Sequence, residues 1–318
     1  MAPGPFNIAA KRIWVAGHRG MVGAAVVRRL KAEPCELVVA GREEVDLTRQ
    51  ADVERWIDRQ RLDAVILCAA RVGGIHANAT LPADFLFENL MIGANVTNAT
   101  YRAGVRRLVN LGSSCMYPRE AAQPIGEASL MTGPLEPTNE AYAIAKIAAA
   151  GMASMYRRQF GVDYVTVVPT NLYGPGDNFD PTMSHVAPAL MRRMIEARDA
   201  GAPKVEIWGS GKPRRELMFV DDAADAIVFL LEHYSAAEPI NIGTGSDVSI
   251  RELAELIARV VGYRGELAFD ASKPDGAPRK LLDSSRLAGL GWRARTDLAE
   301  GLAQMYRWYS NRKVDVAA

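Results

Sequence analysis

The fold of this 318-residue chain is decided near its start by Arg-Ile-Trp-Val-Ala-Gly-His-Arg-Gly-Met-Val-Gly at residues 12–23. Arg12–Ala16 is a short apolar run typical of a buried strand, and Met21–Ala32 has the apolar spacing of a helix. The glycines between them permit a tight turn and a close approach of the backbone to a pyrophosphate. Because the start of a helix has free N–H groups, we expect a dinucleotide here. The alternative is a glycine-rich turn with no ligand.

Short apolar runs alternate with longer helical patterns over the first two-thirds of the chain. The further strands expected here are Leu37–Ala40, Ala64–Ala70, Leu108–Leu111 and Tyr164–Val168, and the helices are Gln50–Asp58, Asp84–Ala103 and Asn139–Phe160. Continuous apolar strands separated by helices indicate a parallel sheet covered on both faces. We therefore predict an α/β fold with a doubly wound parallel sheet of the Rossmann type. Such a sheet binds ligands at the carboxyl ends of its strands.

The pattern changes after Tyr173, where the loop Gly174–Thr182 is rich in Gly, Pro, Asp and Asn and marks a domain edge. Helices are expected at His185–Arg198, Asp221–His233, Ser249–Val261 and Asp297–Ser310, and short strands at Val205–Trp208, Pro239–Ile242 and Leu267–Phe269. We predict a dinucleotide-binding domain of residues 11–176, to which 216–246 returns. Residues 177–215 and 247–318 would form a smaller, discontinuous α/β substrate domain.

Composition excludes several classes of function. Lys and Arg number 38 against 37 Asp and Glu, so no net charge attracts nucleic acid or an anionic membrane. No apolar run nears the roughly 18 residues of a membrane span. The three cysteines, Cys35, Cys68 and Cys115, are odd in number and far apart, which favours a reduced, cytoplasmic protein. Since no Cys or His pair has zinc-ligand spacing, we expect no metal.

The residues after the second expected strand bear on the choice between NAD and NADP. An acid at the strand end would bind the ribose 2′-hydroxyl of NAD. Here Arg42 comes first, and Glu43 and Glu44 follow it. Arg42 and Arg19 could together hold a 2′-phosphate, because guanidinium binds phosphate in a bidentate manner. We therefore predict NADPH/NADP+ as the cofactor, the alternative being NAD bound by one of the two glutamates.

A second constellation indicates catalysis. Tyr142 and Lys146 are four residues apart on one face of an expected helix, and Ser113 follows the fourth expected strand. An ammonium lowers the pKa of a nearby phenol, ordinarily near 10, and can also bind the nicotinamide ribose. A serine can hydrogen-bond the same substrate oxygen. This set resembles the extended short-chain dehydrogenase/reductase family, whose Ser, Tyr and Lys serve hydride transfer at a carbon–oxygen bond.

The resemblance extends from about Arg12 to about Trp308. It is carried by residues 17–23, 69–75, 111–118, 136–146, 169–175, 184–190 and 271–276. Together these segments resemble the branch of the family that epimerises carbons 3 and 5 of GDP-4-keto-6-deoxy-D-mannose and then reduces its 4-keto group with NADPH to give GDP-L-fucose. The resemblance implies that Cys115 takes a proton from carbon and that His185 returns one. Tyr142 and Ser113 would stabilise the enolate oxygen, and Tyr142 would then protonate the alkoxide. Taken alone, Cys115 is more typical of a buried structural thiol and His185 of a helix cap.

The resemblance also implies binding residues. For the cofactor these are Gly17, His18, Arg19, Gly20, Met21, Val22, Gly23, Arg42, Asp46, Leu47, Leu111, Gly112, Ser113, Ser114, Tyr142, Lys146, Pro169, Asn171, Leu172 and His185. For the sugar nucleotide they are Arg193, Trp208, Arg215, Asp275 and Lys280, each of which would otherwise pass for a surface residue. Relatives of this type are homodimers built on paired long helices, which Asp84–Ala103 and Asn139–Phe160 could supply.

Three alternatives remain. A nucleotide-sugar 4,6-dehydratase of the same family needs an acid pair beside its active serine, whereas Ser114 and Cys115 follow Ser113. A 4-epimerase would leave Cys115 and His185 without a role. A non-catalytic NADP-binding regulator could keep the fold, since fold does not fix function.

Overall fold

The computed structural model describes residues 6–273 and 275–317. Its main sheet has six parallel strands in the order β10-β5-β4-β3-β1-β2. The strands are β1 (Arg12–Ala16), β2 (Glu36–Val38), β3 (Ala64–Leu67), β4 (Arg107–Leu111), β5 (Asp163–Pro169) and β10 (Ile240–Ile242). The predicted doubly wound parallel sheet is confirmed. The chain reverses its direction of growth between β1 and β3, and ligands bind at such a switch point.

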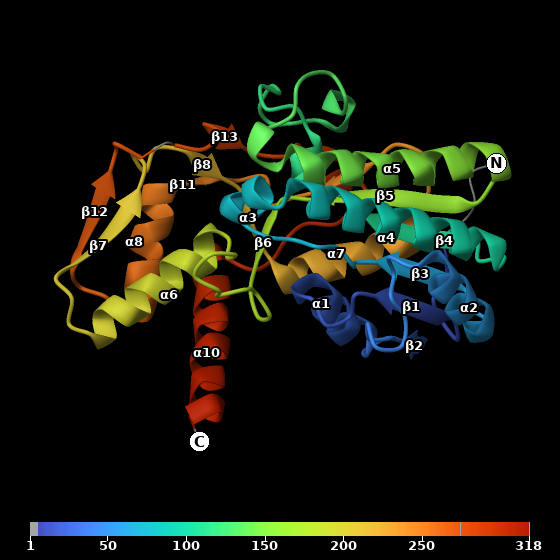
Figure 1. Ribbon diagram of the computed structural model, residues 1–318, viewed down its shortest axis with the longest axis horizontal. Coiled ribbons are helices and arrows are strands. Elements are labelled where there is room, and N and C mark those ends of the chain that lie inside the picture. Colours follow the sequence, from blue (N-terminus) through green and yellow to red (C-terminus); the bar gives the residue numbers. More distant parts are fainter. Residues whose placement is uncertain (1–5, 274, 318) are drawn as a thin grey trace.

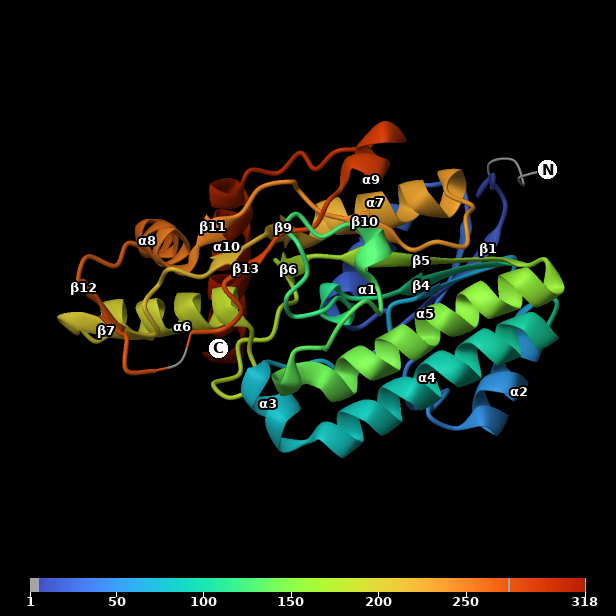
Figure 2. The same ribbon diagram turned by 90° about the horizontal axis from the view of Figure 1, so that it is seen from above.

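Helices cover both faces of this sheet (Figures 1 and 2). On one face lie α1 (Met21–Leu30) and α7 (Val220–His233), and on the other lie α2 (Gln50–Gln60), α4 (Pro82–Arg102) and α5 (Glu140–Phe160). Successive residues of a strand point to opposite faces. Accordingly, Ile13 and Val15 of β1 are buried with α1 and α7, whereas Trp14 is buried against the α2 side. Burial on both faces explains why these strands are mostly apolar.

A smaller part of the chain has an apolar core of its own and lies beyond one end of the main sheet (Figure 1). It contains α6 (Val186–Asp199), β7 (Lys204–Trp208), α8 (Ile250–Val261), β12 (Glu266–Asp270) and α10 (Leu298–Ala317). Helix α8 begins with a capping box of Ser249 and Glu252 and ends at Gly262, whose φ of 76° is left-handed. Its apolar stripe packs against α6 and α10. Among the helices of the described residues, none is long and apolar enough to cross a membrane.

Several short elements were not predicted. They are α3 (Ile75–Thr80), β6 (Asn171–Tyr173), β8 (Arg214–Arg215), β9 (Leu217–Phe219), β11 (Val248–Ser249), β13 (Arg279–Lys280) and α9 (Ser285–Gly289). Strands of two or three residues are too short to show a periodic pattern. The paired strands β6 and β9 lie where the two cores meet: Met218 is buried in the core of the main sheet, whereas Tyr173, Leu217 and Phe219 are buried in the smaller core.

A buried carboxylate fixes this junction. Glu216 is fully buried, and its carboxylate accepts hydrogen bonds from the backbone N–H groups of Thr244 (2.6 Å), Gly245 (2.8 Å) and Leu282 (2.9 Å). Its own carbonyl accepts from the side-chain amide of Asn171 (2.9 Å). Loops that follow β5, β10 and β13 are thereby held together at the carboxyl ends of the main sheet.

Candidate active site

The glycine turn after β1 is shaped to receive a phosphate. Gly17 has a φ of 87°, and a Cβ there would lie 2.6 Å from the backbone of Ala69. A Cβ on Gly23 would lie 2.1 Å from the carbonyl oxygen of Gly17. Gly20 occupies the N-cap position of α1 and gives it no side-chain cap, so the first N–H groups of this helix have no side-chain acceptor. The turn therefore fits the pyrophosphate of a dinucleotide.

Two arginines flank the place where the adenosine ribose of such a dinucleotide would lie. Arg19 makes a bidentate ion pair with Glu43, one contact of which is 2.9 Å long. The Arg42 side chain is 75% exposed and has Asp46 as its acidic neighbour at 4.0 Å. Asp46 is also held by Thr48, whose backbone N–H and hydroxyl donate to its carboxylate (3.0 and 2.7 Å). The Arg19 guanidinium is thus paired with a carboxylate of the protein, whereas that of Arg42 is largely free.

The expected cofactor residues beyond this region lie at the carboxyl ends of the central strands. Leu111, Gly112, Ser113 and Ser114 end β4 or follow it, and Pro169, Asn171 and Leu172 end β5 or form β6. Leu47 precedes α2, and its carbonyl accepts a hydrogen bond from Asn95 of α4 (3.0 Å).

Ser113, Tyr142 and Lys146 come together as predicted. Ser113 follows β4 and starts the short helix η1 (Ser114–Met116), because its hydroxyl accepts the backbone N–H of Cys115 (3.3 Å). The Ser113 side chain lies close enough to that of Tyr142 to affect its pKa. Burial raises the pKa of the Tyr142 phenol well above its usual range, the charge of Cys115 adds to this, and the side chain of Ser113 opposes it. Without a further cation, Tyr142 is therefore a proton donor.

Lys146 is the buried cation nearest to this phenol in the described structure. Its ammonium donates to the carbonyl of Leu111 (2.7 Å) and lies 5.8 Å from the centre of the Tyr142 ring. Burial lowers the pKa of Lys146 to about 8, and Cys68 opposes the shift. The ammonium is therefore mostly charged at neutral pH and titrates just above it.

Two hydrogen-bond donors are directed at the sulfur of Cys115. The Asn139 Nδ2 donates to Sγ at 3.2 Å, and the Lys280 Nζ lies 3.9 Å from the same atom. The helix predicted from Asn139 begins one residue later, and Asn139 occupies the N-cap position without capping it. Its Oδ1 is buried without a protein partner. Asn139 was missed by sequence reasoning, although its spacing of three from Tyr142 places both on one side of α5.

His185 lies on another rim of the same region. It directly precedes α6 and, like Asn139, gives its helix no side-chain cap. Solvent reaches the imidazole, yet the surrounding protein lowers its pKa by desolvation. The preceding residues pack on the loop after β3: the backbone N–H of Gly74 donates to Met183 (2.9 Å), and a Cβ on Gly74 would lie 2.6 Å from the Ser184 carbonyl oxygen.

Helix α3 extends this packing towards Asn139. It contacts η3 (Pro137–Asn139), which ends at Asn139, and both figures place α3 between α5 and α6. In the described part of the chain, no hydrogen bond joins His185 to Cys115 or Tyr142. The two residues expected to carry protons, Cys115 and His185, lie on different segments, η1 and the start of α6.

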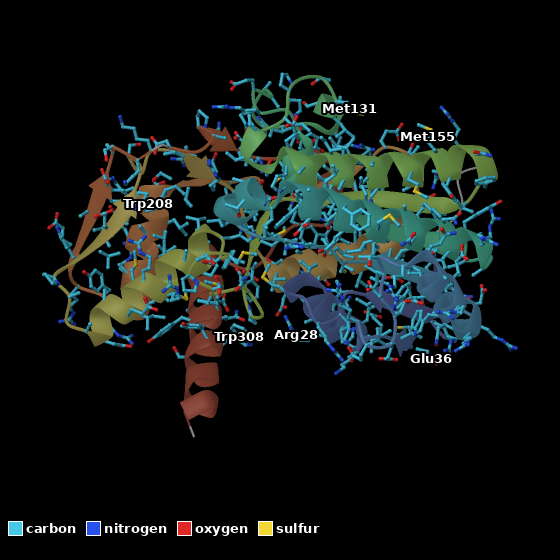
Figure 3. All side chains as sticks on the ribbon, in the orientation of Figure 1. Arg28, Glu36, Met131, Met155, Trp208 and Trp308 are labelled. Carbon is cyan, nitrogen blue, oxygen red and sulfur yellow. The ribbon has the colours of Figure 1, made fainter. Side chains whose placement is uncertain are left out.

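The residues expected to bind the sugar nucleotide gather mostly around the loop 209–211. Trp208 ends β7, is 66% exposed and lies away from the main sheet (Figure 3). The carboxylate of Asp275 accepts from the backbone N–H (2.9 Å) and hydroxyl (2.7 Å) of Ser210. Arg215 donates to the carbonyl of Ala277 (2.7 Å), and Arg193 of α6 donates to that of Glu206.

Lys280 connects this loop cluster to the thiol. It pairs in register with Arg215 across strands β8 and β13, and its ammonium reaches Cys115. The resemblance implies that Lys280 binds the sugar nucleotide, and the geometry adds the sulfur of Cys115 as its neighbour. The described residues contain no group of three or more metal-ligating side chains.

Comparison with protein families decides the relationship. The model of the NAD dependent epimerase/dehydratase family matches residues 13–243, which include the glycine turn, Ser113, Tyr142 and Lys146. The chain belongs to this family. The resemblance to extended short-chain dehydrogenase/reductases is thereby confirmed.

Members of this epimerase/dehydratase family resemble the chain over nearly its full length. A GDP-L-fucose synthase of Sinorhizobium fredii is 54% identical over 305 residues, which cover 96% of this chain and 97% of the relative. The GDP-L-fucose synthase of Escherichia coli is 51% identical, with 94% and 96% covered. A solved GDP-L-fucose synthetase of Naegleria fowleri bound to NADP superposes with a TM-score of 0.90 at 26% identity, over 98% of each chain.

Proposed function

We propose that this chain converts GDP-4-keto-6-deoxy-D-mannose to GDP-L-fucose by epimerisation at carbons 3 and 5 followed by NADPH-dependent reduction at carbon 4. The observation that carries the proposal is the thiol of Cys115 beside the Ser113–Tyr142 pair, with Asn139 and Lys280 directed at its sulfur. A reductase needs the serine, tyrosine and lysine, but it has no use for a base beside them. The full-length GDP-L-fucose synthase relatives support the same reaction.

The first step uses the acidity that a ketone gives to the carbons on either side of it. The thiolate of Cys115 takes the proton from carbon, and the electron pair moves to the ketone oxygen. Ser113 and Tyr142 donate hydrogen bonds to that oxygen as it becomes negative. His185 then gives a proton to the carbon from the opposite face, which inverts the centre. Cys115 must lose its proton and His185 must regain one before the second inversion.

Asn139 and Lys280 favour the reactive form of Cys115. A thiolate is the effective base, and hydrogen-bond donors and cations stabilise it relative to the thiol. Asn139 supplies a fixed donor, because it ends η3 and occupies the N-cap position of the packed helix α5. Lys280 of strand β13 supplies a positive charge from another part of the chain.

The second step reuses the same oxygen-binding groups. When bound, NADPH supplies a hydride to carbon 4. Tyr142 gives its proton to the oxygen of that carbon, and the positive charge of Lys146 offsets the cost of leaving a buried phenolate. The glycine turn would hold the pyrophosphate, and Arg42 and Arg19 the 2′-phosphate.

The nucleotide half of the substrate would be held by the residues around the loop 209–211. Arg193 and Arg215 are the candidates for its diphosphate. Trp208 offers a flat apolar face to guanine or ribose. Asp275 could accept from the guanine amino and ring N–H groups in place of Ser210.

The alternatives fit this site less well. A 4,6-dehydratase would need a carboxylate where Cys115 lies. A 4-epimerase would not use a thiol with two donors directed at it. A binding-only regulator would not need Tyr142 and Lys146 in hydrogen-bonding positions.

Incubation of the pure protein with NADPH and GDP-4-keto-6-deoxy-D-mannose, followed by NMR of the product sugar, tests this function. We expect GDP-L-fucose. A reduced product that keeps the manno configuration at carbons 3 and 5 would refute the epimerase half. No consumption of NADPH would refute the whole proposal.

We further propose a cytoplasmic homodimer of chains in which residues 11–176 and 216–246 bind the cofactor and residues 177–215 and 247–318 bind the sugar nucleotide. All three cysteines are free thiols. Helices α4 and α5 lie side by side and carry exposed apolar side chains at Phe87, Ile144 and Met155, which a second copy would cover. A monomeric mass in solution would contradict the dimer.

A further inference from the structure

The turn after β2 places an acid where the cofactor's 2′-phosphate is expected. The carbonyl of Gly41 accepts the backbone N–H groups of Glu44 and Val45 (both 3.0 Å), which folds residues 41–45 back on themselves. The Glu43 carboxylate consequently lies over Gly41, and a Cβ on this glycine would lie 2.3 Å from its Oε1 and 2.4 Å from its Oε2. Glu43 therefore fills the space that a side chain at position 41 would occupy.

In dinucleotide-binding sheets, the end of the second strand lies beside the adenosine ribose of the cofactor. NAD-binding enzymes place an acid at the end of the second strand, where it accepts the ribose 2′-hydroxyl. Here that position is Gly41, and the carboxylate of Glu43, two residues later, occupies the volume that a side chain at position 41 would fill. The same carboxylate makes a bidentate ion pair with Arg19, which reaches it from the phosphate turn.

The ion pair between Arg19 and Glu43 hinders the binding of a 2′-phosphate by Arg19. Arg19 cannot bind a phosphate in a bidentate manner while it is engaged by Glu43, so the bound phosphate has to displace the carboxylate. Both side chains are more than half exposed, at 65% and 58%, so the exchange needs no unfolding of the site. A 2′-hydroxyl carries no charge and leaves the pair intact, and it could donate to Glu43.

We propose that Glu43 is a built-in competitor for the 2′-phosphate: it holds Arg19 in the free protein and thereby lowers the preference for NADPH over NADH. The inference rests on the proposed use of NADPH. Glu44 is a natural control, because its carboxylate accepts the backbone N–H of Gly41 (3.1 Å) and makes no ion pair with Arg19 in the described structure.

The test is a set of dissociation constants for NADPH and NADH, measured by fluorescence titration of the wild-type protein, Glu43→Gln and Glu44→Gln. Because exposed ion pairs contribute little, we expect Glu43→Gln to tighten NADPH binding by about three- to fivefold. NADH should not bind more tightly, and Glu44→Gln should change both constants by less than about twofold. In an Arg19→Ala background, Glu43→Gln should give no gain.

Unchanged or weaker NADPH binding by Glu43→Gln would overturn the inference, as would a gain that persists without Arg19. The wild-type protein alone tests the proposed cofactor: if it binds NADH as tightly as NADPH, the cofactor assignment fails. The ratio of the NADPH dissociation constants of Glu43→Gln and the wild type tests the role of Glu43 as a competitor, so the two failures can be told apart.

Discussion

Removal of the Asn139 amide should slow epimerisation far more than reduction. Its Nδ2 donates to the Cys115 sulfur at 3.2 Å, while the Lys280 ammonium, at 3.9 Å, remains in the variant. A hydrogen bond to a charged group contributes about 1.5–3 kcal/mol. Since about 1.4 kcal/mol corresponds to a tenfold change in rate, Asn139→Ala should slow proton abstraction by roughly 10- to 150-fold. Asn139→Asp, of nearly the same shape, should be slower still because it directs an anion at the sulfur.

The assay is exchange of deuterium from D₂O into carbons 3 and 5 of the 4-keto sugar, followed by proton NMR without NADPH. The rate at which iodoacetamide alkylates Cys115 gives a second readout, because only the thiolate reacts. Thr138→Ala is the matched control, since this neighbour's hydroxyl contacts Glu136 instead of the sulfur. Exchange in Asn139→Ala within about twofold of the wild-type rate would refute the role of Asn139.

Four further outcomes are expected. Tyr142→Phe should lower NADPH consumption by roughly 10²- to 10⁴-fold, the usual contribution of a general acid, and near-normal consumption would remove Tyr142 as proton donor. Arg42→Ala should weaken NADPH binding by about 10-fold or more and leave NADH nearly unaffected; equal losses would exclude a 2′-phosphate contact. The Lys146 ammonium has a pKa lowered to about 8, so its charge is present below pH 8 and lost above it. Titrations of the free protein should accordingly show weaker NADPH binding above pH 8, and a constant affinity from pH 7 to 9.5 would contradict this. Glu216→Ala leaves one buried and two partly buried N–H donors without their acceptor, at about 1–3 kcal/mol for the buried donor and less for the other two, so urea unfolding should show a loss of a few kcal/mol, and a loss below 1 kcal/mol would be inconsistent with the junction described.

Local patterns were enough to predict the main sheet and the proximity of Ser113, Tyr142 and Lys146. The apolar runs of β1, β3, β4 and β5 can be recognised because each strand is buried on both faces. That these three residues lie close together could be predicted because helical spacing and a strand end fix their relative positions. The approach of Lys280 to Cys115 could not be predicted, since 165 residues separate them and the contact depends on the pairing of β13 with β8.

Two further features depended on tertiary structure. Asn139 was expected as the first residue of a helix and was given no role, and its engagement with Cys115 follows from the exact start of α5 at Glu140. The pairing of Glu43 with Arg19 needs the fold of residues 41–45 and the direction of the phosphate turn together. The sequence contains both charges but does not reveal that they meet.

A single measurement in D₂O addresses whether one site performs both reactions. The protein is given GDP-4-keto-6-deoxy-D-mannose and NADPH, and the deuterium content and configuration of the product sugar are determined by NMR. The account predicts a sugar of the L-fuco configuration with deuterium at both carbon 3 and carbon 5, and a loss of that deuterium incorporation in Cys115→Ser. A product reduced at carbon 4 with protium at both positions would contradict it.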